Sequence, residues 1–226
     1  MPVITNSFDI GTMTTERLSL EPLRAEDADE MAVVLDDQRL HEFTGGRPAT
    51  VDELRAHYER LVAGPAKPDE VWFNWIVRRR TDAQPVGTVQ ATLTSRDGRW
   101  RASVAWVIGT EWQRQGFASE AVRALVERLR EEGADEIVAH IHPDHRASAA
   151  VAARAGLEPT DDRMEGEQVW RVPALEPRSS AAHWAMSERE RSIISSWRSG
   201  STSRQMERTS TASSNSGLST YSIISS

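Results

Sequence analysis

The sequence predicts an α+β domain built on a mixed, mostly antiparallel, twisted sheet that is flanked by helices. Strand and helix patterns alternate over residues 1–173 in the order β-α-α-β-β-β-α-β-α-β. Three of these strands follow one another directly, which indicates an antiparallel meander. A long amphipathic helix separates the meander from the strands that follow it, and this combination is typical of the α+β class.

The opening segment predicts one strand and two helices. Residues 17–23 alternate polar and apolar side chains, as a half-buried strand does, and apolar side chains then recur at helical spacing between residues 28 and 35. Thr50 and Glu53 have the spacing of a capping box, in which each side chain accepts a hydrogen bond from the other residue's amide. A second helix is therefore expected to begin at this point.

The meander is expected over residues 71–78, 86–93 and 100–108, which are rich in β-branched and aromatic side chains. The dipeptide Asp97-Gly98 lies between the last two of these runs. Both residue types tolerate a positive φ, which a two-residue hairpin turn requires. The last two strands are therefore predicted to form a tight hairpin.

The longest helix is predicted to begin near Gly116 and to end at Gly133, a residue type that commonly follows the last helical turn. The apolar residues of this helix share one face; they are Phe117, Ala121, Val122, Leu125, Val126 and Leu129. A strand over 136–141, a short helix over 148–155 and a strand over 169–172 complete the predicted order.

The composition changes after Pro173, which predicts one domain over residues 1–173 and a tail over 174–226. The tail contains 17 serines in 53 residues and has no sustained apolar period. Such a segment buries too little apolar surface to offset the entropy lost on ordering, so disorder is expected.

Composition and charge exclude several classes of function. The formal net charge is −7, and an acidic body does not favour nucleic acid or an anionic membrane, although it suits a cationic acceptor. The chain has no cysteine, so disulfides, thiolate metal sites and a cysteine nucleophile are excluded. No spacing of His, Asp and Glu indicates a metal site. With no secretory signal or membrane-spanning run visible, we expect a cytoplasmic monomer or homodimer.

One strand-to-helix junction carries a pattern suited to anion binding. The pattern is Gln113-x-x-Gly116-x-Ala118, at the start of the longest predicted helix. The first turn of a helix offers unpaired N–H groups and the positive end of the helix dipole, and a glycine lets the backbone approach a phosphate. Taken alone, the pattern is equally consistent with an ordinary loop.

The segment around this junction resembles motif A of the GNAT superfamily of N-acetyltransferases, whose pyrophosphate loop is Gln/Arg-x-x-Gly-x-Gly/Ala. The resemblance extends over about residues 14–173. The other matching segments are Thr15–Leu20, Glu120-Ala121, Pro85-Val86-Gly87, His145–Ser148 and Ala155-Gly156-Leu157. The opening segment is most similar to the subgroup that contains the ribosomal-protein N-terminal (alanine/serine) acetyltransferases.

The resemblance implies acetyl-CoA as the co-substrate and assigns it a set of contacts. Backbone amides of Gln113, Arg114, Gln115, Gly116, Phe117, Ala118 and Ser119 would hold the pyrophosphate. Pantetheine would lie along Val107 and Ile108, where the sheet splays and the family's strand carries a bulge whose amide stabilises the oxyanion. His145 stands where the family usually has an asparagine that contacts CoA, and an imidazole can also donate a hydrogen bond.

The resemblance identifies the catalytic residues less directly than the cofactor contacts. A neutral amine must lose a proton to a base, and the leaving thiolate must gain one. The tyrosine that serves as acid in many relatives has no counterpart at the right place, so the resemblance points to Ser148, which can equally serve as a helix N-cap. Glu167 is the candidate base, with a solvated loop charge as the alternative. His140 and His142 share one strand face, and they are either alternative bases or, equally, residues at the edge of the sheet.

The expected function is transfer of an acetyl group from acetyl-CoA to a primary amine, either a protein N-terminus or a small molecule. The absence of cysteine means that the transfer must be direct rather than through an acyl-enzyme on that residue. The alternative is a noncatalytic acyl-CoA-binding sensor module of the same fold, which the loss of the family's tyrosine and asparagine makes conceivable.

Overall fold

The computed structural model describes residues 8, 10–43 and 45–173, and the predicted tail lies outside this part of the chain. The helical elements of the described part are η1 (Ala25–Asp27), α1 (Ala28–Val34), η2 (Gln38–His41), α2 (Val51–Ala63), η3 (Thr110–Trp112), α3 (Phe117–Glu131) and α4 (Arg146–Arg154). The strands are β1 (Met13–Thr14), β2 (Leu18–Pro22), β3 (Glu70–Arg79), β4 (Pro85–Arg96), β5 (Arg99–Ile108), β6 (Glu136–Ile141), β7 (Glu158–Met164) and β8 (Glu167–Arg171).

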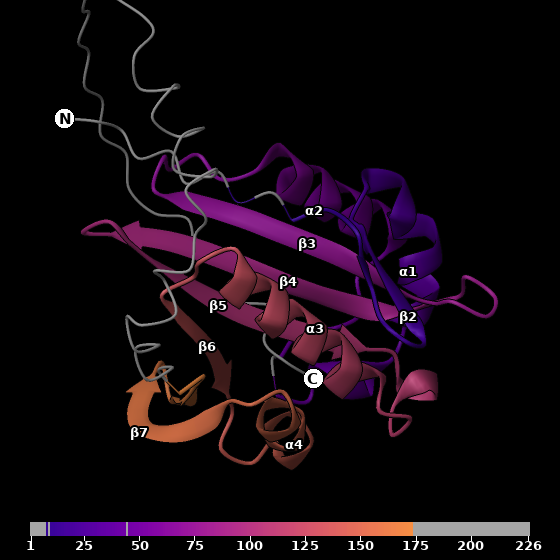
Figure 1. Ribbon diagram of the computed structural model, residues 1–226. Helices are drawn as coiled ribbons and strands as arrows, with labels where there is room; N and C mark the ends of the chain where they lie inside the picture. Colours follow the sequence, from indigo (N-terminus) through magenta and orange to yellow (C-terminus); the bar gives the residue numbers. More distant parts are fainter. Residues whose placement is uncertain (1–7, 9, 44, 174–226) are drawn as a thin grey trace, which may run out of the picture. The chain divides into compact units, whose positions relative to one another are not determined.

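The eight strands form one sheet in the order β1-β2-β3-β4-β5-β6-β8-β7. All neighbouring pairs are antiparallel except β5 and β6, which are parallel because α3 connects them as a crossover. Figure 1 shows α3 in front of the central strands, with α1 and α2 on the other side of the sheet. The predicted α+β class and its mostly antiparallel sheet are confirmed.

The local signals of the sequence explain the main elements. Thr50 and Glu53 form the predicted capping box at the start of α2, and Asp97 and Gly98 both adopt positive φ in the two-residue turn between β4 and β5. All six apolar residues predicted for α3 are buried, and Gly133 follows the helix with a φ of +90°.

The order differs from the prediction by two strands, β1 and β7. β1 is only two residues long. β7 has the sequence Glu-Pro-Thr-Asp-Asp-Arg-Met, and six of its seven residues are exposed. An edge strand that buries neither face needs no apolar alternation, so periodicity could not detect it.

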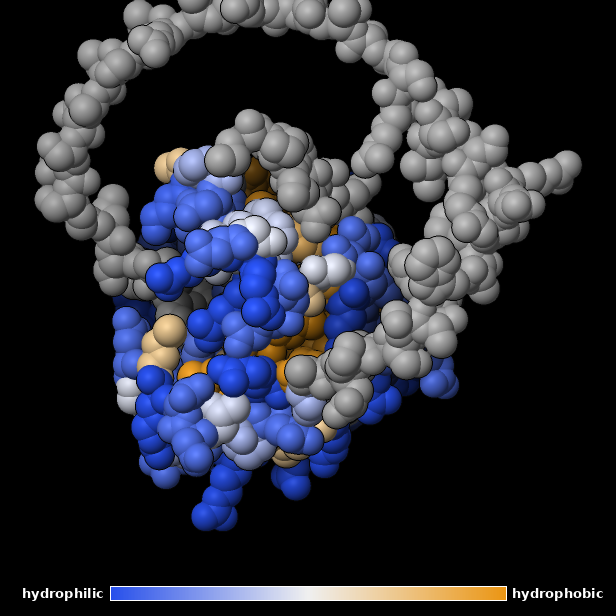
Figure 2. Space-filling model, turned by 60° about the vertical axis from the view of Figure 1, so that its left-hand side comes forward, coloured by the Kyte–Doolittle hydropathy of each residue, from blue (hydrophilic) through white to orange (hydrophobic). Residues whose placement is uncertain are grey.

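Two apolar cores lie on opposite faces of the sheet. The larger packs α3 against the face of β5 that carries Trp106 and Ile108, and the smaller packs α1 and α2 against Ile76. The tryptophans Trp75 and Trp106 are core residues. The face of the molecule in Figure 2 is largely hydrophilic, with apolar side chains visible in a recessed strip.

Candidate active site

The sheet opens between its two parallel strands. β5 and β6 pair only through Arg101–Ser103 and Glu136–Val138, so beyond Ser103 the edge of β5 has no strand partner on that side within the described residues. The Gly109 amide donates to Val86 on β4 at 2.9 Å. Because ladder groups alternate along an antiparallel strand, the amides of Trp106 and Ile108 point away from β4, into this gap.

The prediction of a bulge in β5 is wrong. β4 and β5 pair continuously from Gly87↔Ile108 to Arg96↔Arg99 without a register shift. The gap-facing amides therefore belong to a regular strand. The close approach of the two strands explains why residue 87 is a glycine, because a Cβ at that position would lie 2.1 Å from the carbonyl oxygen of Val107. Only glycine lets β4 approach this end of β5 so closely.

The loop between β5 and α3 turns its carbonyl groups away and leaves its amides available. The side chain of Gln113 donates to the Ile108 carbonyl at 3.0 Å, and that of Gln115 donates to the Glu111 carbonyl at 3.2 Å. Gly116 caps α3 in the left-handed region with φ +85°. The amides of residues 116–119 have no acceptor in the described part of the chain. Four such amides at the positive end of a helix dipole are suited to bind an anion.

Arg17 and Glu120 hold this loop from behind. The guanidinium of Arg17 donates to the Gln115 carbonyl at 3.0 Å and to the Glu120 carboxylate at 2.7 Å, and it stacks over the ring of Phe117 at 4.9 Å. Glu120 also accepts from the hydroxyl of Thr15 at 2.6 Å. The segment before β2 is thereby fastened to the first turn of α3.

We expect Arg17→Gln to raise the KM for acetyl-CoA about tenfold, since charge-assisted hydrogen bonds that orient the loop are lost. The kcat should change by less than about threefold, because Arg17 does not reach the reacting end of the cleft. Steady-state kinetics separates the two constants. Arg80→Gln is the control, since Arg80 donates to the carbonyls of Thr15 and Glu16 but not to the loop. An equal loss in both variants would contradict a positioning role for Arg17.

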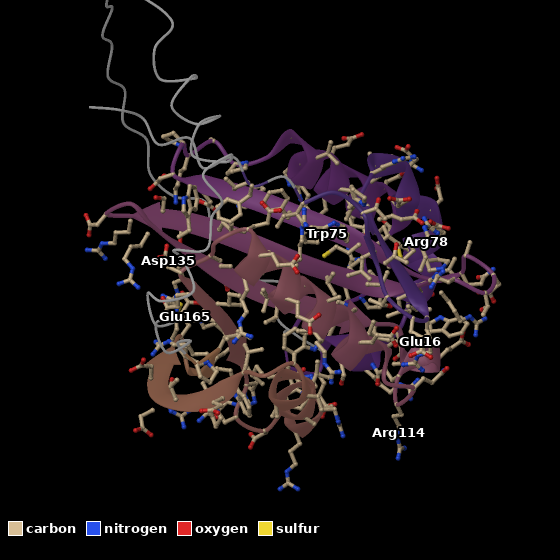
Figure 3. All side chains as sticks on the ribbon, viewed as in Figure 1. Glu16, Trp75, Arg78, Arg114, Asp135 and Glu165 are labelled. Atoms are coloured by element: carbon tan, nitrogen blue, oxygen red, sulfur yellow. The ribbon has the colours of Figure 1, made fainter. Side chains whose placement is uncertain are left out.

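A cleft of about 1020 Å³ begins at this loop and runs between α3 and α4. Four arginines line it, namely Arg39, Arg114, Arg146 and Arg154. Arg39 is paired with Asp37, and the other three have no carboxylate partner among the described residues. Arg114 extends away from the body of the protein in Figure 3. Unpaired arginines in an otherwise acidic chain suit a ligand with several phosphate charges.

His145 caps α4 at the far side of the cleft. Its Nδ1 accepts from the Ser148 amide at 3.4 Å, so the neutral ring carries its proton on Nε2. Burial lowers the pKa of His145, which keeps the ring neutral. The Nε2 atom is buried and has no hydrogen-bond partner among the described residues, and the ring stacks on Phe43 at 4.3 Å. His145, rather than Ser148, is therefore the N-cap of α4.

Ser148 and Glu167 are both buried but lie in different places. Ser148 is 1 % exposed and lines the cleft. Glu167 is 9 % exposed at the start of β8, which rules out a solvated loop charge, but it is not among the residues that line the cleft. Burial raises the pKa of the Glu167 carboxyl. His142 lies 5.3 Å from the ring of Phe43.

The structure brings together most of the residues predicted for the cofactor. Ile108, the seven residues from Gln113 to Ser119, and His145 all line the cleft together with Ser148. Val107 does not, since its side chain lies on the other face of β5. The sequence reasoning assigned no role to Arg17 and Glu120. Both residues lie in segments that match the family pattern, but a match in sequence does not reveal that the two side chains are in contact.

Two features are absent from the described residues. No group of three or more His, Cys, Asp or Glu side chains is placed to hold a metal ion. No helix in the described ranges is long and apolar enough to cross a membrane.

Known proteins share this architecture. Residues 17–158 match the family described as acetyltransferase (GNAT) domain. A candidate ribosomal-protein-serine acetyltransferase from Vibrio cholerae is 22 % identical, covers 73 % of this chain and 98 % of its own, and has a TM-score of 0.55. RimL, a ribosomal L7/L12 alpha-N-protein acetyltransferase solved with coenzyme A, is 13 % identical over 70 % of this chain and 95 % of its own, with a TM-score of 0.57.

The microcin C7 self-immunity acetyltransferase MccE, solved with acetyl-CoA and AMP, is 14 % identical over 70 % of this chain and 92 % of its own, with a TM-score of 0.56. Among curated proteins there is no significant match.

A split sheet with unpaired helix N-terminal amides at the mouth of its cleft suits a transferase whose donor carries phosphate groups. The family match covers more than half of the chain, so the chain belongs to the GNAT acetyltransferase family. It is an acyl-CoA-dependent N-acetyltransferase, and acetyl-CoA is its donor.

Proposed function

We propose that this enzyme transfers the acetyl group directly to the primary amine of a protein N-terminus, with a small-molecule amine as the second candidate acceptor. The donor site is inferred from the four amides of residues 116–119, which have no acceptor among the described residues. The edge of β5 beyond Ser103, which has no strand partner in the same part of the chain, leads inward from them. Direct transfer requires donor and acceptor to be bound together, and a sheet that opens between two strands gives access to both.

The residues of the cleft fit acetyl-CoA. The amides of residues 116–119 would bind the pyrophosphate, and Arg114, Arg146 and Arg154 would offset the remaining phosphate charge. The amides of Trp106 and Ile108 face the gap and would pair with the pantetheine arm. The buried Nε2–H of His145 supplies a further donor where the family usually has an asparagine.

The transfer forms a bond between the amine nitrogen and the acetyl carbon and breaks the bond between that carbon and sulfur. Acetyl-CoA supplies the acetyl group as a thioester. An amide on the open edge of β5 would donate a hydrogen bond to the thioester carbonyl oxygen. Glu167 would take the proton of the amine through a water molecule, and the Ser148 hydroxyl would donate a proton to the departing sulfur.

Two considerations favour a protein N-terminus. An α-amine has a pKa of roughly 7.7–8.0, against about 10.4 for a lysine side chain, so it is neutral more often at physiological pH. RimL and the Vibrio cholerae protein are both described as acting on ribosomal proteins. MccE, a self-immunity acetyltransferase, supports the small-molecule alternative. A cytoplasmic location and a monomeric or homodimeric state remain expectations.

The test combines calorimetry with thiol release. The full-length protein is titrated with acetyl-CoA, and CoA release is then followed with N-terminal peptides and a panel of small amines. Binding followed by release with peptides supports the proposal, and release only with small amines moves the acceptor to the second candidate. Binding of acetyl-CoA without CoA release for any amine would contradict catalysis and favour a sensor. Absence of acetyl-CoA binding would contradict the proposed donor site.

We expect Ser148→Ala to lower kcat about tenfold and to change the KM for acetyl-CoA by less than about twofold. The effect is moderate because a thiol has a pKa near ~8.5, so its thiolate leaves readily even without a proton donor. Ser95→Ala, on β4 and away from the cleft, is the matched control for loss of a hydroxyl. An unchanged kcat in a correctly folded Ser148→Ala protein would remove Ser148 from the mechanism.

A further inference from the structure

One wall of the acetyl-CoA cleft is formed by η2 and the residues that follow it. The hydroxyl of Thr110 donates to the carboxylate of Asp37, the N-cap of η2, at 2.6 Å. The end of α1 packs against the residue before Thr110, since a Cβ on Gly109 would lie 2.7 Å from the carbonyl oxygen of Val34. Both contacts come directly after Ile108, so this wall is fastened beside the gap-facing amide at the end of β5.

Glu42 places a carboxylate in this wall. Its amide donates to the Arg39 carbonyl at 3.3 Å, which fixes the backbone at the end of η2, and its side chain is exposed and lines the cleft. Within the described ranges it is the one acidic residue that lines the cleft, and its carboxylate makes no ion pair or hydrogen bond there. Burial lowers the pKa of His145, and the charge of Glu42 acts against this shift, so the carboxylate lies near that ring.

The other charges of the cleft have partners once the donor is bound as proposed. Arg39 is paired with Asp37, and the three arginines without a carboxylate partner would offset the phosphate groups of acetyl-CoA. Glu42 would then be the charge of the wall that nothing opposes. An anionic acceptor would meet both this carboxylate and the donor's phosphate charge, whereas a cationic acceptor would be attracted to them.

The cation that Glu42 suits is not the reacting nitrogen itself. A carboxylate beside an ammonium group raises the pKa of that group, and a protonated amine cannot attack the thioester. A second cationic group on the acceptor has no such disadvantage, because it stays charged throughout the reaction. Phe43 lines the cleft next to Glu42, so the aliphatic chain that joins the two nitrogens can pack on its ring.

We propose that Glu42 is a specificity-determining residue that binds a second positive charge of the acceptor. The preferred acceptors are then dications, in which a cationic group lies a short chain away from the reacting amine. A peptide with Lys or Arg in its second position carries this chemistry, and so does an aliphatic diamine. The inference rests on the proposed function, since it concerns the acceptor of the same reaction.

The test compares acceptors that differ only in this second charge. Peptides of one sequence with Lys, Gln or Glu in the second position are assayed by kcat/KM with the full-length protein, alongside 1,4-diaminobutane and 1-aminobutane. Their binding to the protein saturated with CoA is measured by calorimetry, which does not depend on turnover. We expect the lysyl peptide to exceed the glutaminyl peptide by about fivefold to tenfold in both measurements, as an exposed charge-assisted contact provides. The ratio should fall as salt is raised from about 0.05 M to about 0.5 M, because exposed charges are screened.

Glu42→Gln should reduce this ratio to less than about twofold, and Glu42→Lys should reverse the order of the lysyl and glutamyl peptides. Acetyl-CoA affinity should not fall in either variant, because the substitutions remove a negative charge from a cleft that binds phosphate. Glu59→Gln and Glu59→Lys are the matched controls, since Glu59 is exposed on α2 and does not line the cleft. Both controls should keep the preference of the wild type.

The outcomes separate this inference from the proposed function. Turnover that does not depend on the second residue, or a preference for Lys that survives in Glu42→Lys, overturns the role of Glu42 and leaves the function standing. Selective binding of the lysyl peptide without CoA release supports the role of Glu42 and overturns the function. A preference for 1,4-diaminobutane over 1-aminobutane with no peptide turnover supports the role of Glu42 and assigns it to a small-molecule acceptor.

Discussion

Gly116→Glu is expected to weaken acetyl-CoA binding by at least about 1000-fold while the domain stays folded. The new carboxylate would stand at the end of the row of amides that is proposed to bind phosphate, where like charges repel. The substitution also forces a side chain onto a residue with φ +85°, and its Cβ would lie 3.3 Å from a guanidinium nitrogen of Arg17. Calorimetric titration with acetyl-CoA measures the loss.

Gly98→Glu is the matched control for this variant. Gly98 has φ +77° and open space around it at the tip of the hairpin between β4 and β5, so the control adds the same charge and a comparable backbone strain away from the cleft. Acetyl-CoA affinity should be unchanged in the control. Similar affinity in both variants and the wild type would show that phosphate does not bind at Gly116.

Glu167→Gln is expected to lower kcat by about 100-fold or more, which is the range of a general base. The amide has the same shape but cannot take a proton. The KM for acetyl-CoA should change little, because Glu167 does not line the cleft. Glu165→Gln is the control, since Glu165 lies in the adjacent turn and is exposed (Figure 3). Equal activity of the two variants would exclude Glu167 as the base.

Glu167→Gln should also raise the free energy of unfolding at neutral pH, because the pKa of Glu167 is raised in the folded protein. Burial raises the pKa of Glu167 above its ordinary value of 4.5 in the folded protein. Between that value and the raised one the folded state binds more protons than the unfolded state, so the free energy of unfolding falls as the pH rises. Glutamine is not ionised, so the Glu167→Gln protein does not lose stability by burying a charge. Its melting temperature should therefore exceed that of the wild type at pH 7 and should not exceed it at pH 4. A gain that is independent of pH would contradict this account.

The local structure was largely predictable because it depends on neighbours in the sequence. The capping box at Thr50 and Glu53, the turn at Asp97-Gly98 and the apolar face of α3 each rest on residues a few positions apart, and all three are confirmed. The position of Gly116 at the start of a helix followed from the same kind of signal. β7 was missed because it has no buried face to impose a period.

The site was predictable only in part because its remaining contacts are long-range. Arg17 and Glu120 are 103 positions apart, and no local pattern encodes their contact. The stacking of Phe43 on His145 and the burial of Glu167 likewise depend on how the sheet closes.

The short pairing of β5 with β6 has a consequence for aggregation. A sheet normally exposes unpaired backbone only along its two outermost strands, and proteins protect those strands against intermolecular pairing. Within the residues that the structure describes, an additional edge inside the sheet has no strand partner, beyond Ser103. A donor bound along β5, as proposed, would cover that edge and, by mass action, would also favour the folded state. The resistance of the protein to self-association should therefore rise and fall with the concentration of acetyl-CoA around it.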